Sequence, residues 1–77
     1  MAYQPKPQGG FLDQFEFYKV IDGRKVYRGE DRYYSWDELH GEVEVEVFNR
    51  TGYHLGSVDA VSGERKKPAV RGRRIHL

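Results

Sequence analysis

The 77-residue chain contains no cysteine, so it has neither a disulfide framework nor a zinc site built on cysteine ligands. It also lacks any apolar run long enough to span a bilayer, and its first residues, MAYQPKPQGG, do not form the apolar core of a secretory signal. A chain of this length makes one domain, close to the lower size limit at which a single core folds unaided. We therefore expect one small soluble domain without a membrane segment or an export signal of its own.

Hydrophobic periodicity is missing from residues 1–10, which contain two prolines and two glycines. This composition predicts a flexible lead-in, followed by a single domain over residues 11–77. At the start of that domain, the segment FLDQF places its apolar residues on one face of a short helix, although alternation further along also fits a strand. The pair Asp22-Gly23 then predicts a hairpin turn between the segments FYKVI and RKVYR.

The clearest periodic element is segment 42–48, EVEVEVF, in which glutamates and valines alternate. That period predicts a half-buried antiparallel strand with its valines in the core. The next residues, NRTG, predict a turn, and residues 53–59 predict the partner strand. Pro68 and Gly72 predict a loop, which leaves residues 73–77 as a candidate edge strand. Together these signals predict a mainly β fold (α+β), a small, highly twisted antiparallel sheet with a short N-terminal helical segment.

Acidic and basic residues gather in separate parts of the chain, although the net charge is only +1. From Glu30 to Glu46, seven acidic residues accompany the single base Arg32, whereas from Glu64 to Leu77 six basic residues accompany one acid. A basic segment of this kind is typical of a surface that contacts phosphates, and equally of a solvated tail. The sequence therefore predicts a polarised molecule and leaves both readings of the tail open.

Acidic residues and a histidine crowd together around the predicted strand. Glutamates on the wet face of a strand are ordinary, because charge there discourages aggregation. Asp37 and His40 lie just ahead of them, however, and carboxylates that repel one another favour proton binding by one of them, which suits acid–base chemistry. A metal site of Asp37, His40 and Glu42 is an alternative, but no metal-nuclease motif accompanies it.

Strand spacing does not decide which glutamate works with His40. Along an extended strand, residues two apart lie about 7 Å from each other and residues four apart about 13 Å. Glu42 is therefore the nearer partner, unless Gly41 supplies a bend that admits Glu44.

The aromatic residues admit two interpretations. Four rings could stack on unpaired RNA bases or fill the core of a domain that needs their buried area: those of Tyr33, Tyr34, Trp36 and Tyr53. The core is favoured for Trp36 and one of the tyrosines. His54 and His76 have no evident partner in the sequence, and we assign them no role.

Three blocks in the same order, YSWDELHGEVEV, GYHLGSVDAVSGE and KKPAVRGRRI, resemble the cytotoxic ribonuclease domain of the ribosome-inactivating colicins and of cloacin. Similar toxin domains occur on contact-dependent inhibition proteins. The resemblance covers about Arg24 to Leu77. It implies an endoribonuclease toxin that cuts small-subunit (16S) rRNA at the decoding centre by attack of a 2′-hydroxyl, with no metal or cofactor, and so blocks translation. It also implies action in the bacterial cytoplasm, secretion or delivery as part of a larger toxin, and two partners, the 30S ribosomal subunit and a small acidic immunity protein.

Transferred by position, the family's catalytic residues fall on Asp37, His40, Glu44 and Arg73. Glu44 would be the base for the 2′-hydroxyl, and Arg73 would stabilise the pentacoordinate phosphorane. His40 would protonate the leaving oxygen, with Asp37 as its carboxylate partner. The residues expected to contact the substrate are Glu42, Tyr34, Trp36, Lys66, Lys67, Arg71 and Arg74.

Two other interpretations stay open. A non-catalytic RNA- or ribosome-binding module would need the basic segment but not Asp37, His40 or Glu44. A protein-interaction domain would use its acidic strand only as a soluble edge. Cleavage of ribosomes in the presence of EDTA would distinguish the nuclease from both.

Overall fold

The computed structural model describes residues 10–36 and 44–77. Within them a short 3-10 helix precedes six strands: η1 (Phe11–Gln14), β1 (Glu16–Ile21), β2 (Arg24–Gly29), β3 (Arg32–Trp36), β4 (Glu44–Asn49), β5 (His54–Asp59) and β6 (Arg65–Pro68). The strands pair antiparallel in chain order, from β1 to β6, as one meander. The predicted mainly β fold is confirmed. In the described part of the chain, no helix has the length and hydrophobicity that a bilayer crossing needs.

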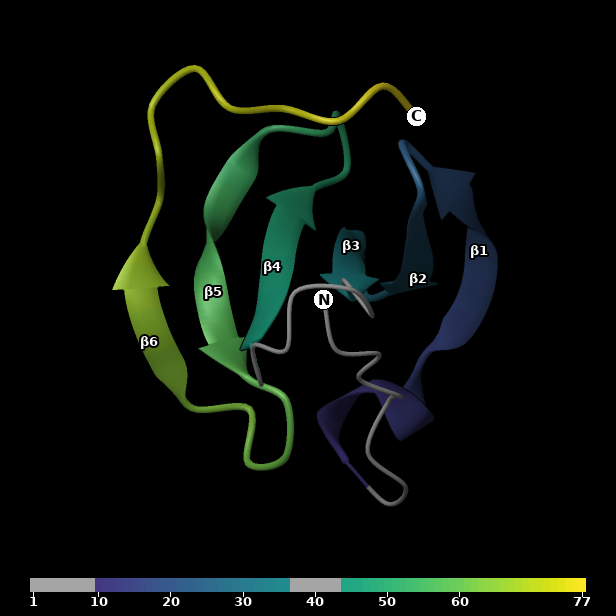
Figure 1. The fold of residues 1–77 in the computed structure, drawn as a ribbon, viewed down its shortest axis with the longest axis vertical. Helices are drawn as coiled ribbons and strands as arrows, with labels where there is room; N and C mark the ends of the chain where they lie inside the picture. The colour runs from purple at the N-terminus through teal and green to yellow at the C-terminus, as the bar shows by residue number, and fades with distance from the viewer. Residues whose placement is uncertain (1–9, 37–43) are drawn as a thin grey trace.

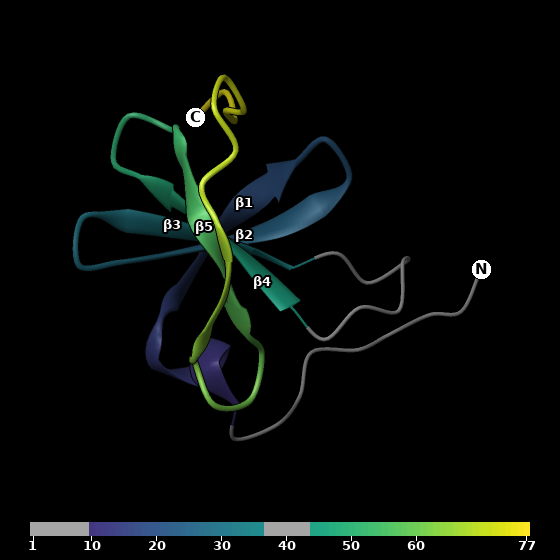
Figure 2. The ribbon, with the colours of Figure 1, turned by 90° about the vertical axis from the view of Figure 1, so that its left-hand side faces the viewer.

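The sheet is strongly curved and twisted. Figure 1 shows β6 and β1 on opposite sides of the molecule, with the C-terminal segment crossing its upper end from the β6 side towards β1. Turned by 90°, the hairpins splay in different directions from a common centre (Figure 2). The crossing is supported by a hydrogen bond of 2.7 Å from Lys19 Nζ on β1 to the Leu77 carbonyl oxygen. The basic C-terminal segment therefore lies across one end of the sheet.

Local side chains and backbone conformations close the turns. Asp22 and Gly23 have φ angles of 51° and 78°, as a type I′ hairpin requires, and the predicted β1–β2 turn is confirmed. Between β4 and β5, Asn49 Oδ1 accepts hydrogen bonds from two backbone N–H groups of the turn, both at 3.0 Å. Between β5 and β6, Asp59 Oδ1 accepts two more, at 2.8 and 2.9 Å, and these bonds hold the pKa of the Asp59 carboxyl below its usual value.

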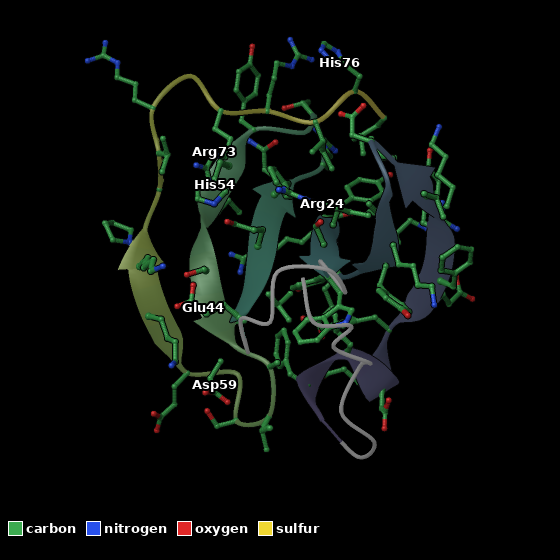
Figure 3. The ribbon with its side chains drawn as sticks, in the orientation of Figure 1. Arg24, Glu44, His54, Asp59, Arg73 and His76 are labelled. Carbon is green, nitrogen blue, oxygen red and sulfur yellow. The ribbon has the colours of Figure 1, made fainter. Side chains whose placement is uncertain are left out.

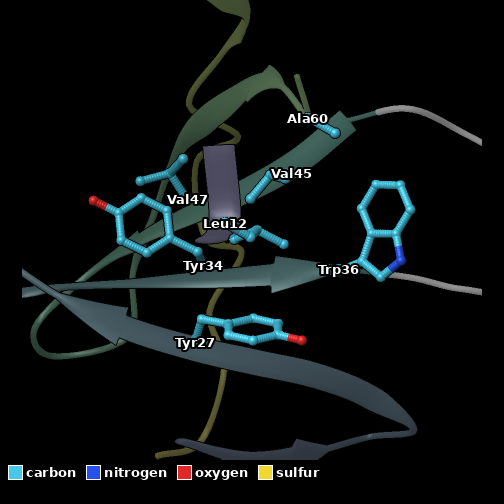
Figure 4. Packing of buried hydrophobic residues seen from close by; sticks show 7 residues of the cluster. All are labelled: Leu12, Tyr27, Tyr34, Trp36, Val45, Val47 and Ala60. Carbon is cyan, nitrogen blue, oxygen red and sulfur yellow. The ribbon is translucent and has the colours of Figure 1, made fainter. Parts of the chain in front are cut away.

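Side chains of strand β4 alternate between the two faces of the sheet. Val45 and Val47 are buried on one face, while Glu44 and Glu46 are partly exposed on the other. The predicted alternation is thus confirmed for the described part of segment 42–48, and β5 is the predicted partner strand. The valine face packs against η1 to form the core shown in Figure 4. That core consists of Leu12, Tyr27, Tyr34, Trp36, Val45, Val47 and Ala60.

Two aromatic residues that were expected to contact the substrate lie in this core instead. Trp36 is completely buried, and Tyr34 is 4% exposed. The Phe15 ring stacks on Tyr34 with 4.0 Å between the ring centroids, and burial raises the pKa of the Tyr34 hydroxyl. Neither ring offers an open face to an RNA base, so the substrate-stacking interpretation is wrong for both. The core interpretation holds because a domain this small needs large apolar side chains.

The sheet edge differs from the prediction for residues 73–77. The edge strand beside β5 is β6, whose four residues are exposed. Residues 73–77 instead meet the sheet at an isolated bridge between Tyr53 and Arg74. Lysine and arginine side chains suit a solvent-facing edge, and Pro68, which cannot donate to a ladder, ends it. The C-terminal segment is bonded to the sheet at Gly52, whose carbonyl oxygen accepts a backbone hydrogen bond from that segment at 2.8 Å. The φ of Gly52 is +95°, a conformation that favours glycine.

Candidate active site

The candidate active site lies on the glutamate face of β4 and β5. Glu44 and Glu46 are two residues apart on β4, and both pair with residues of β5, so their side chains share the face opposite the core. Figure 3 shows Glu44 near the start of β4, with His54 and Arg73 beside each other further along the same side. The fold therefore brings acidic and basic residues from distant parts of the sequence to one surface.

Glu44 contacts a lysine of the edge strand. Lys67 Nζ lies 3.1 Å from Glu44 Oε2, and the Ser57 hydroxyl donates to the same oxygen at 3.4 Å. Ser57 pairs with Lys67 across β5 and β6, which directs the lysine over the carboxylate. The Glu44 side chain is 18% exposed and that of Lys67 is 60% exposed. Glu44 and Lys67 therefore form a pair that a substrate can reach from solvent.

Glu46 joins a histidine and an arginine, and we call these three residues the Glu46 cluster. Glu46 Oε1 accepts a hydrogen bond from Arg73 Nη1 at 3.1 Å, and Oε2 accepts one from His54 Nε2. The other ring nitrogen of His54, Nδ1, accepts from the Val70 backbone N–H at 2.8 Å. Because a donor faces Nδ1, the ring proton lies on Nε2 and points at Glu46. The cluster connects β4, β5 and the C-terminal segment.

A register shift explains why His54, to which the sequence assigned no role, has a partner. Between Val47 and Phe48 the β4–β5 pairing slips by one residue, so that Phe48 rather than Asn49 faces His54. A slip of one residue moves a side chain to the opposite face of a sheet, and here it places His54 on the glutamate face. Gly56, with a φ of +135°, was the available sequence signal for an irregularity, but a glycine alone does not specify a bulge.

Three predicted site residues, Asp37, His40 and Glu42, lie outside the described residues. Their roles stay predictions, as does the choice between Glu42 and Glu44 as the partner of His40. The alternative metal site is built on the same three residues and also stays a prediction. Among the residues that the structure describes, no group of three or more His, Cys, Asp or Glu side chains is arranged to hold a metal ion.

The basic residues expected to contact RNA divide into two groups. Lys67 and Arg73 contact the carboxylates of the site. Lys66, Arg71 and Arg74 are exposed on β6 and the C-terminal segment, where Lys66 pairs with Asp59 and the Arg74 guanidinium lies over the Tyr53 ring. The first group therefore belongs with the chemistry of the site, and the second group suits a surface that holds a polyanion.

The arrangement suits chemistry on a phosphate. Each carboxylate faces a cation, which offsets the repulsion that two neighbouring glutamates would exert on an anion. The Glu44 carboxylate can accept a proton. Arg73 uses one nitrogen on Glu46 and its side chain is 47% exposed, so its remaining N–H groups can donate to a phosphate. The site can thus combine a base with a cation for developing negative charge.

Comparison with known protein families identifies the family of this domain. The family model described as Cytotoxic, the cytotoxic domain of colicin and cloacin type, matches residues 19–76. The matched segment contains the strands from β2 to β6 and all of the carboxylates and cations described above. No match is found among curated proteins. Because the family model covers well over half of the sequence, the chain belongs to the Cytotoxic family of colicin- and cloacin-type domains.

Proposed function

We propose that this cytotoxic domain is a metal-independent endoribonuclease that cuts small-subunit (16S) rRNA at the decoding centre and so blocks translation. The observation that supports the proposal best is the position of Glu44 beside Lys67, on the same face as Arg73. These residues supply a proton acceptor and two cations, which cleavage of RNA by its own 2′-hydroxyl requires. Family membership supports a toxin, and the resemblance of the three sequence blocks supports ribosomal RNA as its target.

In the proposed mechanism, Glu44 accepts the proton of the ribose 2′-hydroxyl. The 2′-oxygen attacks the adjacent phosphorus, the bond to the 5′-oxygen breaks, and the leaving oxygen takes a proton from a general acid. His40 is the proposed acid, with Asp37 as its carboxylate partner and Glu42 in a substrate-binding role. Arg73 donates hydrogen bonds to the non-bridging oxygens as negative charge builds on them. The products are a 2′,3′-cyclic phosphate and a new 5′-hydroxyl.

Cleavage without metal is the first expected result. Intact bacterial ribosomes incubated with the protein in EDTA should yield one short 3′ fragment of small-subunit RNA that begins with a 5′-hydroxyl, because the proposed base, acid and cation are all side chains. Gel analysis and end-labelling measure the fragment and its terminus, and ribosomes without the protein are the control. If no fragment forms, or if it forms only after a divalent metal is added, the proposal is wrong.

A second candidate function is favoured by one observation, the basic edge strand β6, in which all four residues are exposed. A non-catalytic RNA- or ribosome-binding module would use such an edge to hold the phosphate backbone. It would bind ribosomes in the same experiment and leave their RNA intact. The exposed Lys66, Arg71 and Arg74 are expected to contact RNA under either function.

We also propose a small acidic immunity protein as a partner, since a cell that makes a translation-blocking nuclease must neutralise it. The proposed site of action is the bacterial cytoplasm, where the ribosomes are, after delivery as part of a larger toxin. An inhibitor that covers Arg65 to Arg74 would exclude the RNA without touching Glu44. A neighbouring gene should therefore encode an acidic protein whose co-expression restores growth.

Association with that protein should be fast and should slow steeply as salt is added, because opposite charges steer the encounter. Stopped-flow measurements across a salt series test this, with Lys66→Gln and Arg71→Gln expected to reduce both the rate and its salt dependence. A protective partner that is basic, or one whose association rate does not change with salt, would contradict the proposal.

A further inference from the structure

We infer that Glu46 and His54 position the guanidinium group of Arg73 on the phosphate and do not themselves exchange protons with the RNA. The inference rests on the proposed function of the site, in which Arg73 stabilises the phosphorane. The sequence assigns no role to His54, and Glu46 is not among the predicted site residues. Arg73 nevertheless contacts Glu46 through its side chain and His54 through its backbone.

The ring of His54 is unsuited to proton transfer with a substrate. Its Nδ1 accepts from the Val70 N–H at 2.8 Å, and its Nε2 donates to Glu46, so both ring nitrogens are already in hydrogen bonds. The side chain is 2% exposed. A buried ring with both nitrogens engaged cannot reach a ribose hydroxyl or a leaving oxygen, because a general acid or base must come within hydrogen-bonding distance of that atom.

The same ring holds the turn that carries Arg73. The backbone N–H of His54 donates to the Arg73 carbonyl oxygen at 3.0 Å, while its ring accepts from Val70 at the other end of the turn. The turn itself is closed by the Arg73 N–H, which donates to the Val70 carbonyl oxygen at 3.2 Å, and Gly72 within it has a φ of +84°. One residue of β5 therefore fixes both ends of the four-residue turn.

Glu46 sets the direction of the arginine side chain. It binds one nitrogen of the guanidinium, Nη1, at 3.1 Å, while 47% of the Arg73 side chain stays exposed. A guanidinium has five N–H donors in a rigid plane, so holding one edge aims the other edge. A partly exposed ion pair of this kind adds little to stability, and its main effect here is to orient the arginine.

Only a carboxylate at residue 46 satisfies both neighbours at once. The two oxygens of Glu46 accept from Arg73 and His54 separately. A glutamine has one carbonyl oxygen, and its amide N–H₂ group would face a donor. Glu46→Gln therefore breaks one of the two contacts while preserving the size of the side chain.

Single-turnover cleavage of ribosomes by Glu46→Gln should be about 10- to 100-fold slower than by the wild type, which is the cost expected when a catalytic group is misplaced by about 1 Å. The loss should be the same at every pH, because no titrating group of the reaction has been removed. In an Arg73→Ala background, adding Glu46→Gln should cause little further loss, since the two changes act through one interaction. Glu64→Gln, which removes the same charge from an exposed residue of the β5–β6 turn, is the matched control and should cleave at the wild-type rate.

Three results would overturn the positioning role of Glu46. If Glu46→Gln removes one limb of the pH–rate profile, or if its effect adds fully to that of Arg73→Ala, Glu46 belongs to the proton transfer and the inference is overturned. A wild-type rate in Glu46→Gln overturns it as well.

A cleavage-independent readout separates this inference from the proposed function. The {¹H}–¹⁵N heteronuclear NOE of the Arg73 Nε–Hε group should be high in the wild type and should fall in Glu46→Gln but not in Glu64→Gln. An unchanged NOE shows that Glu46 does not hold Arg73. If the NOE falls while the wild type fails to cut ribosomes, the positioning is supported and the nuclease function is what fails.

Discussion

Glu44→Gln is expected to slow cleavage of ribosomal RNA by roughly two to four decades, which is the range that removal of a general acid or base produces. Glutamine keeps the size of the side chain and can still accept from the Ser57 hydroxyl, which lies 3.4 Å from Glu44 Oε2. It cannot take a proton from the 2′-hydroxyl. Affinity for the ribosome should hardly change, because the exposed cations that hold RNA are untouched. Single-turnover cleavage and equilibrium binding of the same ribosomes measure the two effects.

The control for this prediction is a variant that weakens binding and spares the chemistry. Lys66→Gln combined with Arg71→Gln removes two exposed cations, so it should lower affinity and flatten the dependence of binding on salt. Lys67 is unsuitable for this purpose, because its ammonium lies 3.1 Å from Glu44. If Glu44→Gln and the double variant lose binding and cleavage in parallel, the division between chemistry and binding is wrong.

Trp36→Ala is expected to destabilise the domain by about 3–5 kcal/mol, the usual cost of truncating a large buried aromatic side chain. Trp36, the only tryptophan in the sequence, is completely buried. A core in a domain of this size rarely supplies more than about 3–5 kcal/mol, so the variant should be largely unfolded at 25 °C. Urea unfolding followed by circular dichroism measures the effect.

Val61→Ala is the matched control for Trp36→Ala. Val61 is an apolar residue that is 62% exposed, and its truncation should change stability by no more than about 0.5 kcal/mol. A Trp36→Ala protein that stays as stable as the wild type but binds ribosomes weakly would contradict the core assignment and restore the base-stacking interpretation.

Much of the fold was predictable from patterns that act over a few residues. The alternation in EVEVEVF, the turn residues Asp22 and Gly23, and the apolar spacing near Phe11 each matched the element that forms. The sheet edge was not predictable in the same way. Pro68 and Gly72 indicated a loop, yet Arg65–Pro68 pairs with β5, because an exposed edge tolerates the basic side chains and places the proline at its end.

The candidate site was predictable only in part. The family blocks pointed to Glu44 and Arg73, which the structure brings to one face, whereas Asp37 and His40 lie outside the described residues. The aromatic residues expected at the substrate are core residues, because burial depends on what packs above a strand and not on the strand's own sequence.

By itself, the sequence determined the mainly β fold class, the turns, the separation of acidic and basic segments, and the family blocks, because each depends on neighbours close along the chain. The tertiary structure decided which carboxylate meets which cation. A one-residue register shift puts His54 on the face of Glu46, and the crossing of the C-terminal segment brings Arg73 to the same place. The pairing of β5 with β6 sets Lys67 over Glu44. These contacts depend on sheet twist and on hydrogen bonds between residues far apart in sequence, which no local spacing records.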